Sequence, residues 1–355
     1  MTNKIPIIKV KSEIKRIQQS NPYIKDVVCI IGGFETTYKS GEVFFAETYD
    51  VAKEVLQDGS ASTLPAANAA LKQVFRKEIS GAIIVNVTTE SSGTYSRDVT
   101  KVKLQAAVAA LTDIEFNLLY VIEDSSNDNL EVVADFRADR FEAKKPFDWI
   151  ATCTRSSKSA YETTMGKVGD GCIAVLTQPL EVEGTTLTLV ESGAYLLNTI
   201  ARLNVGYSLT AKVLEEVTGL GTIYDESTTP KLSEMVGMGY FVIRSINPLE
   251  GTYEVVNSAN ANGLDMYITR VLSYIVNEFA LRKYLGERNN NATLSGISME
   301  CNRILTMFRD DLKLVENITY AVQKKDAETV DVILNTVEFN GIITEIDVAI
   351  TIEVV

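Results

Sequence analysis

The sequence predicts an α/β protein, in which a central α/β domain with a mainly parallel sheet is followed by an α+β C-terminal domain. Between residues 27 and 190, short apolar stretches alternate with segments of helical periodicity. Strands separated by helices usually pair in parallel, because a parallel pair needs a crossover of about a dozen residues or more. From about residue 191, helical periodicity dominates until the chain closes with strands.

The elements of the first region follow from this alternation. Apolar, β-branched runs predict five strands: VVCIIGGF (27–34), GAIIVNVTT (81–89), FNLLYVIED (116–124), DWIATCTR (148–155) and GCIAVLTQPL (171–180). Between them, helical periodicity predicts helices near 66–78, 98–111 and 128–143. The alternation therefore implies an α/β layer with a mainly parallel sheet.

The second region predicts two long helices and a group of strands. Helical periodicity extends over 264–285 and 293–314. Strands are expected at VENITYAVQ (315–323), at TVDVILNTVEF (329–339) and in the final stretch, and a short strand is expected at 5–12.

The final stretch, IITEIDVAITIEVV (342–355), alternates with a period of two, as a half-buried strand does. Its even positions are almost all apolar, whereas Glu345, Asp347 and Glu353 fall on the other face. No returning strand follows it in the sequence. We therefore expect its outer edge to be covered by an earlier segment of the chain or by another molecule.

Composition excludes several classes of function. Among 355 residues there is no histidine, the usual general base and commonest metal ligand, so we predict no catalytic residue, no metal site and no cofactor. The net charge of −13 disfavours direct contact with nucleic acid. No apolar run reaches the roughly 18 residues of a membrane span, so membrane insertion is not expected. The four cysteines are widely spaced and are predicted to be buried thiols.

The order of the elements resembles contractile tail sheath proteins over nearly the whole chain. In the first region the resemblance lies in the order of Ile30-Ile31-Gly32-Gly33-Phe34, VFFAETYDVAKEVL (43–56), an alanine-rich helix, GAIIVNVTT and FNLLYVIED. SGAYLLNTIARLN (192–204) is similar to the small-residue helix that follows this domain in the family. The Arg-containing helix at 264–285, a second helix, a strand pair and a terminal arm are similar to the sheath C-terminal domain.

The resemblance implies a structural protein without enzymatic activity, as in phage tails, tail-like bacteriocins and contractile injection systems. In that family, hexameric rings stack helically around a tail tube, and contraction drives the tube through a target envelope. The implied partners are further copies of the chain, the tail tube protein, and the baseplate and tail terminator proteins. The implied location is a virion tail or tail-like particle assembled in the host cytoplasm.

The two ends of the chain are the expected contacts between subunits, because the arms of this family complete the sheets of neighbouring subunits by strand exchange. Residues 1–25 hold six basic residues and one acidic residue, whereas residues 326–355 hold seven acidic residues and no basic one. Opposite charges across strands would favour pairing; alternatively, two solvated termini simply differ in sign. The candidate arm residues are Ile8, Lys9, Val10, Lys11, Glu345, Ile346, Asp347, Val348, Ile350, Ile352 and Glu353.

A second candidate contact is the stretch 281–325, in which eight basic residues outnumber five acidic ones. In the family this domain lines the inner wall of the sheath. The tube-facing candidates are Arg282, Lys283, Arg288, Arg303, Arg309 and Lys313. The alternative is a surface helix with ordinary mixed charges.

The expected organisation is an N-terminal arm (1–22), an α/β sheath domain (23–190), a connecting helical region (191–245), a C-terminal sheath domain (246–341) and a C-terminal arm strand (342–355). Two other functions stay open. One is a non-contractile tail or shell protein that assembles by the same exchange. The other is a carboxylate-based or nucleotide-dependent α/β enzyme, which would need a well-formed pocket with perturbed acids.

Overall fold

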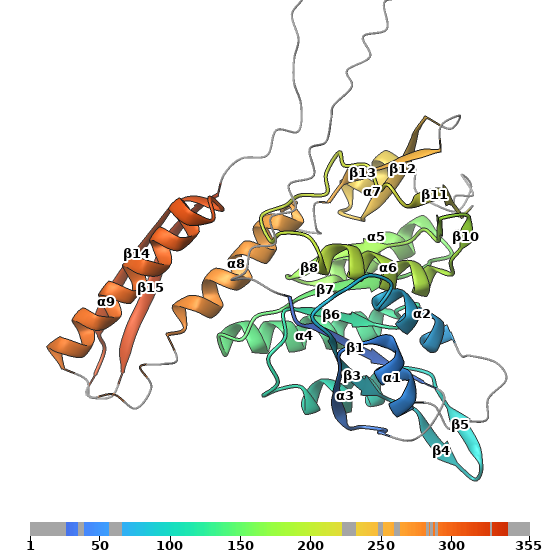
Figure 1. Ribbon diagram of the computed structural model, residues 1–355, viewed down its shortest axis with the longest axis horizontal. Coiled ribbons are helices and arrows are strands. Elements are labelled where there is room, and N and C mark those ends of the chain that lie inside the picture. Colours follow the sequence, from blue (N-terminus) through green and yellow to red (C-terminus); the bar gives the residue numbers. More distant parts are fainter. Residues whose placement is uncertain are drawn as a thin grey trace, which may run out of the picture.

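The computed structural model describes residues 26–34, 39–56, 66–221, 232–247, 251–258, 263–281, 284, 287, 290–326 and 329–339. The predicted strand at 5–12 and the C-terminal arm strand lie outside these residues. Within them, a layered α/β body leads through helix α8 into a smaller unit of helix α9 and the hairpin β14–β15, which projects from the body (Figure 1).

A six-stranded sheet forms the centre of the body and confirms the predicted fold class. Its strand order is β2-β3-β1-β6-β7-β8, and every neighbouring pair is parallel except β2–β3. The strands are β1 (Val28–Gly32), β2 (Val43–Ala46), β3 (Ala82–Asn86), β6 (Leu118–Val121), β7 (Asp148–Thr152) and β8 (Cys172–Leu176). All five predicted strands are present, whereas the antiparallel edge strand β2 was not among them.

Helices cover both faces of this sheet, so successive side chains of a strand enter two different cores. In β1, Val28 and Ile30 pack on the side of α1, α2 and α6, whereas Cys29 and Ile31 pack on the side of α3, α4, α5 and α7. The helices are α1 (Tyr49–Leu56), α2 (Ala66–Val74), α3 (Lys101–Ala110), α4 (Asn127–Glu142), α5 (Lys158–Val168), α6 (Leu189–Ala201) and α7 (Leu232–Gly237). The three predicted helices of this region correspond to α2, α3 and α4, and each begins or ends within a few residues of its predicted bounds.

Helix α6, the small-residue helix of the sequence, lies close against the sheet. A Cβ atom at Gly193 would lie 2.5 Å from the hydroxyl of Tyr120 and from a methyl of Thr152. Tyr120 also donates a hydrogen bond of 2.8 Å to the carbonyl of Val190 at the start of the helix. Any larger residue at position 193 would therefore push α6 away from β6 and β7.

The structure also contains several short strands that the sequence did not predict, some of them beyond residue 191, where mainly helix was expected. They form a three-stranded sheet of β9 (Leu180–Val182), β10 (Thr185–Thr186) and β11 (Val217–Leu220), and a hairpin of β12 (Val242–Asn247) and β13 (Thr252–Asn257). A further exposed hairpin joins β4 (Thr89–Ser91) to β5 (Thr94–Ser96). Polar residues or glycine interrupt these strands, so they lack the uninterrupted apolar run by which the central strands were predicted. The connecting region 191–245 is therefore less helical than predicted.

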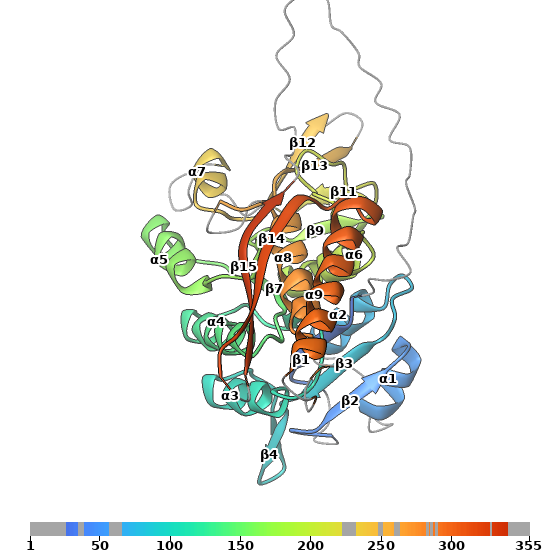
Figure 2. The same cartoon turned by 90° about the vertical axis from the view of Figure 1, so that its left-hand side faces the viewer.

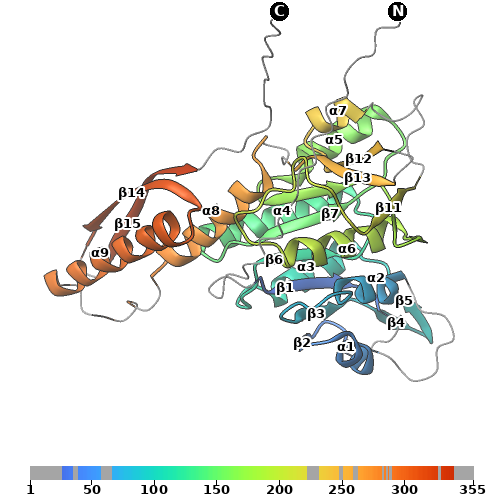
Figure 3. The same ribbon diagram turned by 45° about the horizontal axis from the view of Figure 1, so that its top comes forward.

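The C-terminal unit consists of α8 (Met266–Phe279), α9 (Asn291–Thr306), the π-helical turn η2 (Met307–Asp311), β14 (Val315–Lys324) and β15 (Val330–Phe339). Figure 2 shows the hairpin and α9 in front of the body, and Figure 3 shows α8 leading from the body to them. The predicted helix 264–285 ends earlier, at Phe279, and the following Leu281 adopts a positive φ of 49°. No helix in the described ranges is long and apolar enough to cross a bilayer.

Candidate assembly interface

The β14–β15 hairpin is the first candidate contact surface. Its two strands of ten residues each are antiparallel and pair with no third strand in the described part of the chain. Isolated two-stranded sheets are marginally stable, and a long unpaired edge offers backbone donors and acceptors to another strand. The hairpin is therefore well suited to accept a strand from elsewhere.

One face of the hairpin packs against α8 and α9, but it is only partly covered. The ring centroids of Phe279 and Tyr320 lie 5.8 Å apart, and those of Tyr267 and Phe339 lie 6.4 Å apart. Of the twenty hairpin residues, only Val315 and Ile318 are fully buried. The remaining apolar side chains on this core, which retain some exposure, are Tyr320, Val322, Val330, Val332, Leu334, Val337 and Phe339.

The basic stretch does not form a free positive surface where it is described. Arg303 donates to Glu300 at 2.8 Å, and Arg309 binds both carboxylate oxygens of Asp310 at 2.7 and 2.8 Å. Lys313 also has an interaction partner. Arg282, Lys283 and Arg288 lie outside the described residues. This local pairing favours the mixed-charge alternative, and the tube contact stays a prediction.

Helix α8 joins the C-terminal unit to the body through a buried polar face. Arg270, Ser273 and Tyr274 lie on one side of the helix, at spacings of three and four residues. The guanidinium of Arg270 donates to Asp26 at 2.5 Å, and the hydroxyl of Tyr274 donates to the other oxygen of Asp26 at 2.5 Å. Ser273 donates to Asp148, the first residue of β7, at 2.8 Å.

This polar face is buried. The side chains of Arg270 and Asp26 are 0% and 2% exposed, and Asp148 is 2% exposed. Burial raises the pKa of Asp148 to about 7, although the nearby Arg137 acts in the opposite direction. Burial, and then the charge of Asp26, raises the pKa of the Tyr274 hydroxyl. The joint is therefore a set of mutually dependent charges and hydrogen bonds.

The opposite side of α8 is apolar and belongs to the C-terminal unit. Val271, Ile275 and Phe279 pack in one core with Ile304 and Phe308. A helix with one polar and one apolar buried face can bind two partners at once. Helix α8 is thus the element that connects the body to the hairpin.

A cavity of ≈ 630 Å³ lies at the carboxyl ends of β1 and β6. This is the point where the strand order reverses, the usual ligand position in open α/β sheets. Glu123 lines it, accepts hydrogen bonds from the Asn129 amide at 3.0 and 2.9 Å, and has its pKa raised to about 7 by burial. Glu123 was not among the site residues predicted from the sequence, because only the fold buries a carboxylate at the end of this strand.

The cavity's chemistry is mixed. Acidic Asp98, Glu123, Asp124 and Asp128 line it together with basic Arg97 and Lys101. Asp124 is already held, since it accepts hydrogen bonds from the backbone N–H and the hydroxyl of Thr154. No cluster of three or more potential metal-binding side chains occurs among the residues that the structure describes. The acidic majority disfavours phosphate ligands.

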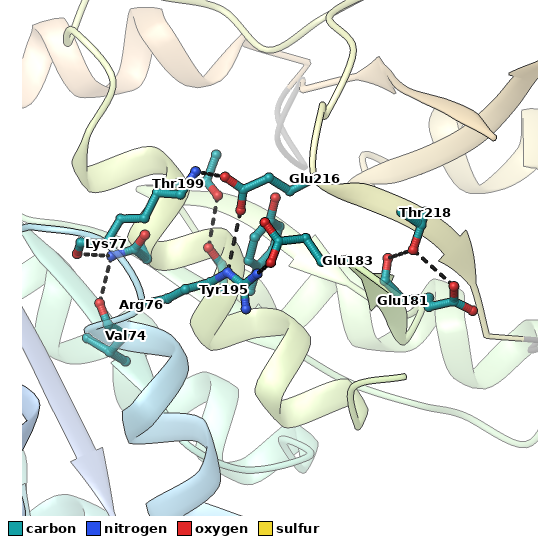
Figure 4. Close-up of polar contacts among 10 residues, drawn as sticks. Val74, Arg76, Lys77, Glu181, Glu183, Tyr195, Thr199, Glu216 and Thr218 are labelled. Carbon is teal, nitrogen blue, oxygen red and sulfur yellow. Dashed lines mark hydrogen bonds and ion pairs between the residues drawn. The ribbon is translucent and has the colours of Figure 1, made fainter. Parts of the chain in front are cut away.

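A cluster of ion pairs attaches the small sheet to the body (Figure 4). Arg76, just after α2, bonds Glu183 at 2.6 Å and lies 3.4 Å from Glu216, which also pairs with Lys77. Glu183 follows β9, and Glu216 precedes β11. These side chains are 19% to 64% exposed, so the cluster orients the small sheet more than it stabilises it.

Solved structures of other proteins share this fold, although their sequences differ. No protein-family model and no curated protein matches the chain. A chain in the baseplate of the anti-feeding prophage is 13% identical, with a TM-score of 0.67 over 99% of this chain and 100% of that one. A chain of the contracted helical sheath of the same particle is 14% identical, with a TM-score of 0.65 over 99% of both chains.

A third solved structure has a similar fold. The sheath tail protein from Listeria innocua is 10% identical, with a TM-score of 0.63 over 89% of this chain and 92% of that one. At these identities the likeness concerns the fold. Over nearly its whole length, this chain has the fold of the sheath proteins of contractile tails and contractile injection systems.

Proposed function

We propose that this chain is the subunit of a contractile sheath that polymerises around a tail tube. The observation that carries the proposal is the open β14–β15 hairpin on a chain whose fold is that of sheath proteins. In the proposed lattice, terminal segments from neighbouring subunits add to the two outer edges of this hairpin. The basic Lys9 and Lys11 on one segment and Glu345, Asp347 and Glu353 on the other would then lie on the exposed face of a shared sheet.

The proposed mechanism is the release of conformational energy stored during assembly. The extended sheath would form on the tube in a metastable state, and a signal from the baseplate would let each ring rotate into tighter lateral contacts. Standard interfaces bury about 1,600 Å² in total, so a modest gain per subunit adds up over many rings. This stroke needs no nucleotide, cofactor or catalytic group.

The proposed partners are the tube protein inside the sheath, the baseplate at one end and a terminator at the other. The solved relatives with this fold come from a sheath and from a baseplate complex, which supports self-assembly together with a baseplate. We propose a phage tail or tail-like particle as the location, with assembly in the host cytoplasm.

Electron microscopy of purified particles tests the proposal directly. Striated cylinders of two lengths, long before and short after triggering, are expected. Cylinders of one fixed length would instead support the non-contractile alternative, and dispersed monomers would contradict both. Removal of residues 343–355 should leave a folded, soluble monomer that builds no cylinders, whereas a truncated monomer that melts would show that this strand belongs to its own core.

One observation favours the enzyme alternative, namely the Glu123 cavity, where a carboxyl with a pKa of about 7 lines a hollow at the carboxyl end of the sheet. The variant Glu123→Gln separates the two functions, because it keeps the size of the side chain and removes its acidity. Cylinder formation and contraction that are unchanged by Glu123→Gln would support the sheath. If Glu123→Gln monomers fold but their cylinders do not contract, the acidic group of Glu123 has a function in the cavity.

A further inference from the structure

We propose that the buried Asp26–Arg270–Tyr274 cluster is a mechanical coupling that passes force from the N-terminal segment directly to α8. The proposal rests on the proposed function for the source of that force, which is a neighbouring subunit holding the N-terminal arm. It goes beyond that function by naming the residues through which the force enters the subunit.

Asp26 lies at the point where the N-terminal segment enters the fold. It is the first described residue, two positions before β1 begins at Val28. Force applied to residues 1–25 therefore reaches Asp26 before it reaches the ladder that β1 forms with β3 and β6. What Asp26 contacts determines where the force goes.

Both carboxylate oxygens of Asp26 are held by α8, which is 244 to 248 residues away along the chain. Arg270 binds one oxygen and Tyr274 binds the other, each at 2.5 Å. A carboxylate bound at both oxygens resists rotation as well as withdrawal. Force on Asp26 is thus resisted by two side chains on one helix face.

Arg270 also fixes the helix to the end of α6. Its guanidinium donates to the carbonyl of Leu203 at 3.3 Å and reaches the carbonyl of Asn204 at 3.5 Å. Its Nε has no hydrogen-bond partner among the described residues, which is a cost that an apolar contact would avoid. Apolar residues often replace buried ion pairs without loss of stability, so this cluster is better explained by the geometry that it imposes than by stability.

The force then has a continuous route to the hairpin. Tyr274 belongs to both the polar cluster and the apolar core that holds α9 and β14. The arm that would bind one neighbour and the hairpin that would accept strands from others are therefore connected through α8. In this proposal α8 takes up the load before the ladder of β1 does, and Ser273 links α8 to Asp148 at the start of β7.

Single-molecule pulling on the full-length monomer tests the coupling. One handle is attached through Thr2→Cys and the other through Met299→Cys, which is 73% exposed on α9; the four native cysteines are buried. We expect Asp26→Asn to raise the rate of the first unfolding step at fixed force about tenfold, which corresponds to about 1.4 kcal/mol. Tyr274→Phe, which keeps the ion pair, should have a smaller effect in the same direction.

Two controls separate the coupling from simple destabilisation. Asp148→Asn makes the same acid-to-amide change beneath the same helix face, but away from the entry point. Because Asp148 also contacts α8, this variant can shift the rate, but by the same factor for either position of the first handle. Moving the first handle to Val102→Cys, which is 74% exposed on α3, bypasses Asp26, so the effect of Asp26→Asn should disappear. Equal effects of Asp26→Asn in both pulling directions would overturn the proposal, as would no effect in either direction.

If Asp26→Asn fails to fold, Tyr274→Phe alone decides the result. Its effect on the unfolding rate is then compared between the two positions of the first handle. Because the measurement uses isolated monomers, it does not depend on whether the chain forms a sheath. A positive result with monomers that never form cylinders would retain the coupling and reject the proposed function. A negative result with a protein that forms normal cylinders would reject the coupling and retain the proposed function.

Discussion

The central sheet and the β14–β15 hairpin differ in how completely one chain covers them. Every residue of β1, β3, β6, β7 and β8 is buried, and helices lie on both faces. In the hairpin, two of twenty residues are buried, and both outer edges lack a strand partner in the described ranges. The sheet is complete within one chain, whereas the hairpin is the part that the proposed assembly would complete.

The largest expected effect comes from a substitution in the central sheet. Trp149 in β7 is 2% exposed, so Trp149→Ala should destabilise the monomer by about 3–5 kcal/mol in urea unfolding, because it leaves a cavity in the core that α3, α4 and α5 cover. Phe339→Ala in β15 is the matched change in the incomplete region. It should cost less than half as much in the monomer, because Phe339 is only partly buried.

Assembly should change this ranking. In cylinders, added strands would bury Phe339, so Phe339→Ala should impair cylinder formation more than it affects the monomer. Equal destabilisation of the monomer by Trp149→Ala and Phe339→Ala would show that the hairpin is as well covered as the sheet, and the comparison would fail.

The next effect is a pH dependence located in the body. The folded state raises the pKa of Asp148 from its ordinary value of 3.8 to about 7, so the folded chain keeps a proton that the unfolded chain loses near pH 4. The resulting stability is fully present below about pH 4 and is lost as the pH rises through about 7. Glu123, whose pKa is also raised to about 7, acts in the same direction.

Asp148→Asn should therefore stabilise the monomer at pH 8 relative to wild type and leave it little changed at pH 4, as measured by urea unfolding at both values. The amide oxygen introduced by this substitution can still accept the hydrogen bond from Ser273, so the packing is retained. A wild-type stability that does not fall between pH 4 and pH 8, or a fall that Asp148→Asn leaves unchanged, would contradict this assignment.

The same contrast explains what the sequence could predict. The central strands are long apolar runs, and their alternation with helices determines a parallel sheet, so the fold class and the five strands followed directly. The edge strand β2 is only two residues from α1, and the strands β9 to β13 are partly polar. Tertiary contacts rather than local pattern specify these strands. The predicted strands of the hairpin were also correct, because ten-residue strands give a strong pattern.

The contacts of the candidate interface were harder to predict from the sequence than the fold was. The Asp26–Arg270 pair joins residues 244 positions apart, and no local pattern relates them. The basic stretch at 281–325 was visible as a charge count, but the pairing of Arg303 with Glu300 and of Arg309 with Asp310 depends on side-chain geometry. The arm residues lie outside the described ranges, so strand exchange stays a proposal.

A moderate effect on assembly is expected from the arm charges. Replacing Glu345, Asp347 and Glu353 with lysine should reduce cylinder formation, since each cross-strand pair of opposite charge contributes about 0.2–1 kcal/mol. Adding Lys9→Glu and Lys11→Glu should partly restore it. Monomer stability is the control and should not change. Failure of the second set to rescue the first would indicate that the termini differ in sign without pairing.

The smallest expected effect concerns the outer side of α9 and η2. Reversing the charge at Arg303, Arg309 and Lys313 should weaken co-sedimentation of the chain with tail tubes while the α/β body stays folded. Arg303 and Arg309 already pair with Glu300 and Asp310, so reversing either of them also creates local repulsion. Reversing Glu300 and Asp310 as well removes this repulsion and serves as the control. If this surface faces the tube, the five-fold variant stays defective, because its acidic groups now occupy the three basic positions. If the five-fold variant recovers fully, only local pairing mattered, and if the triple variant sheathes tubes normally, another surface of the chain lines the inner wall.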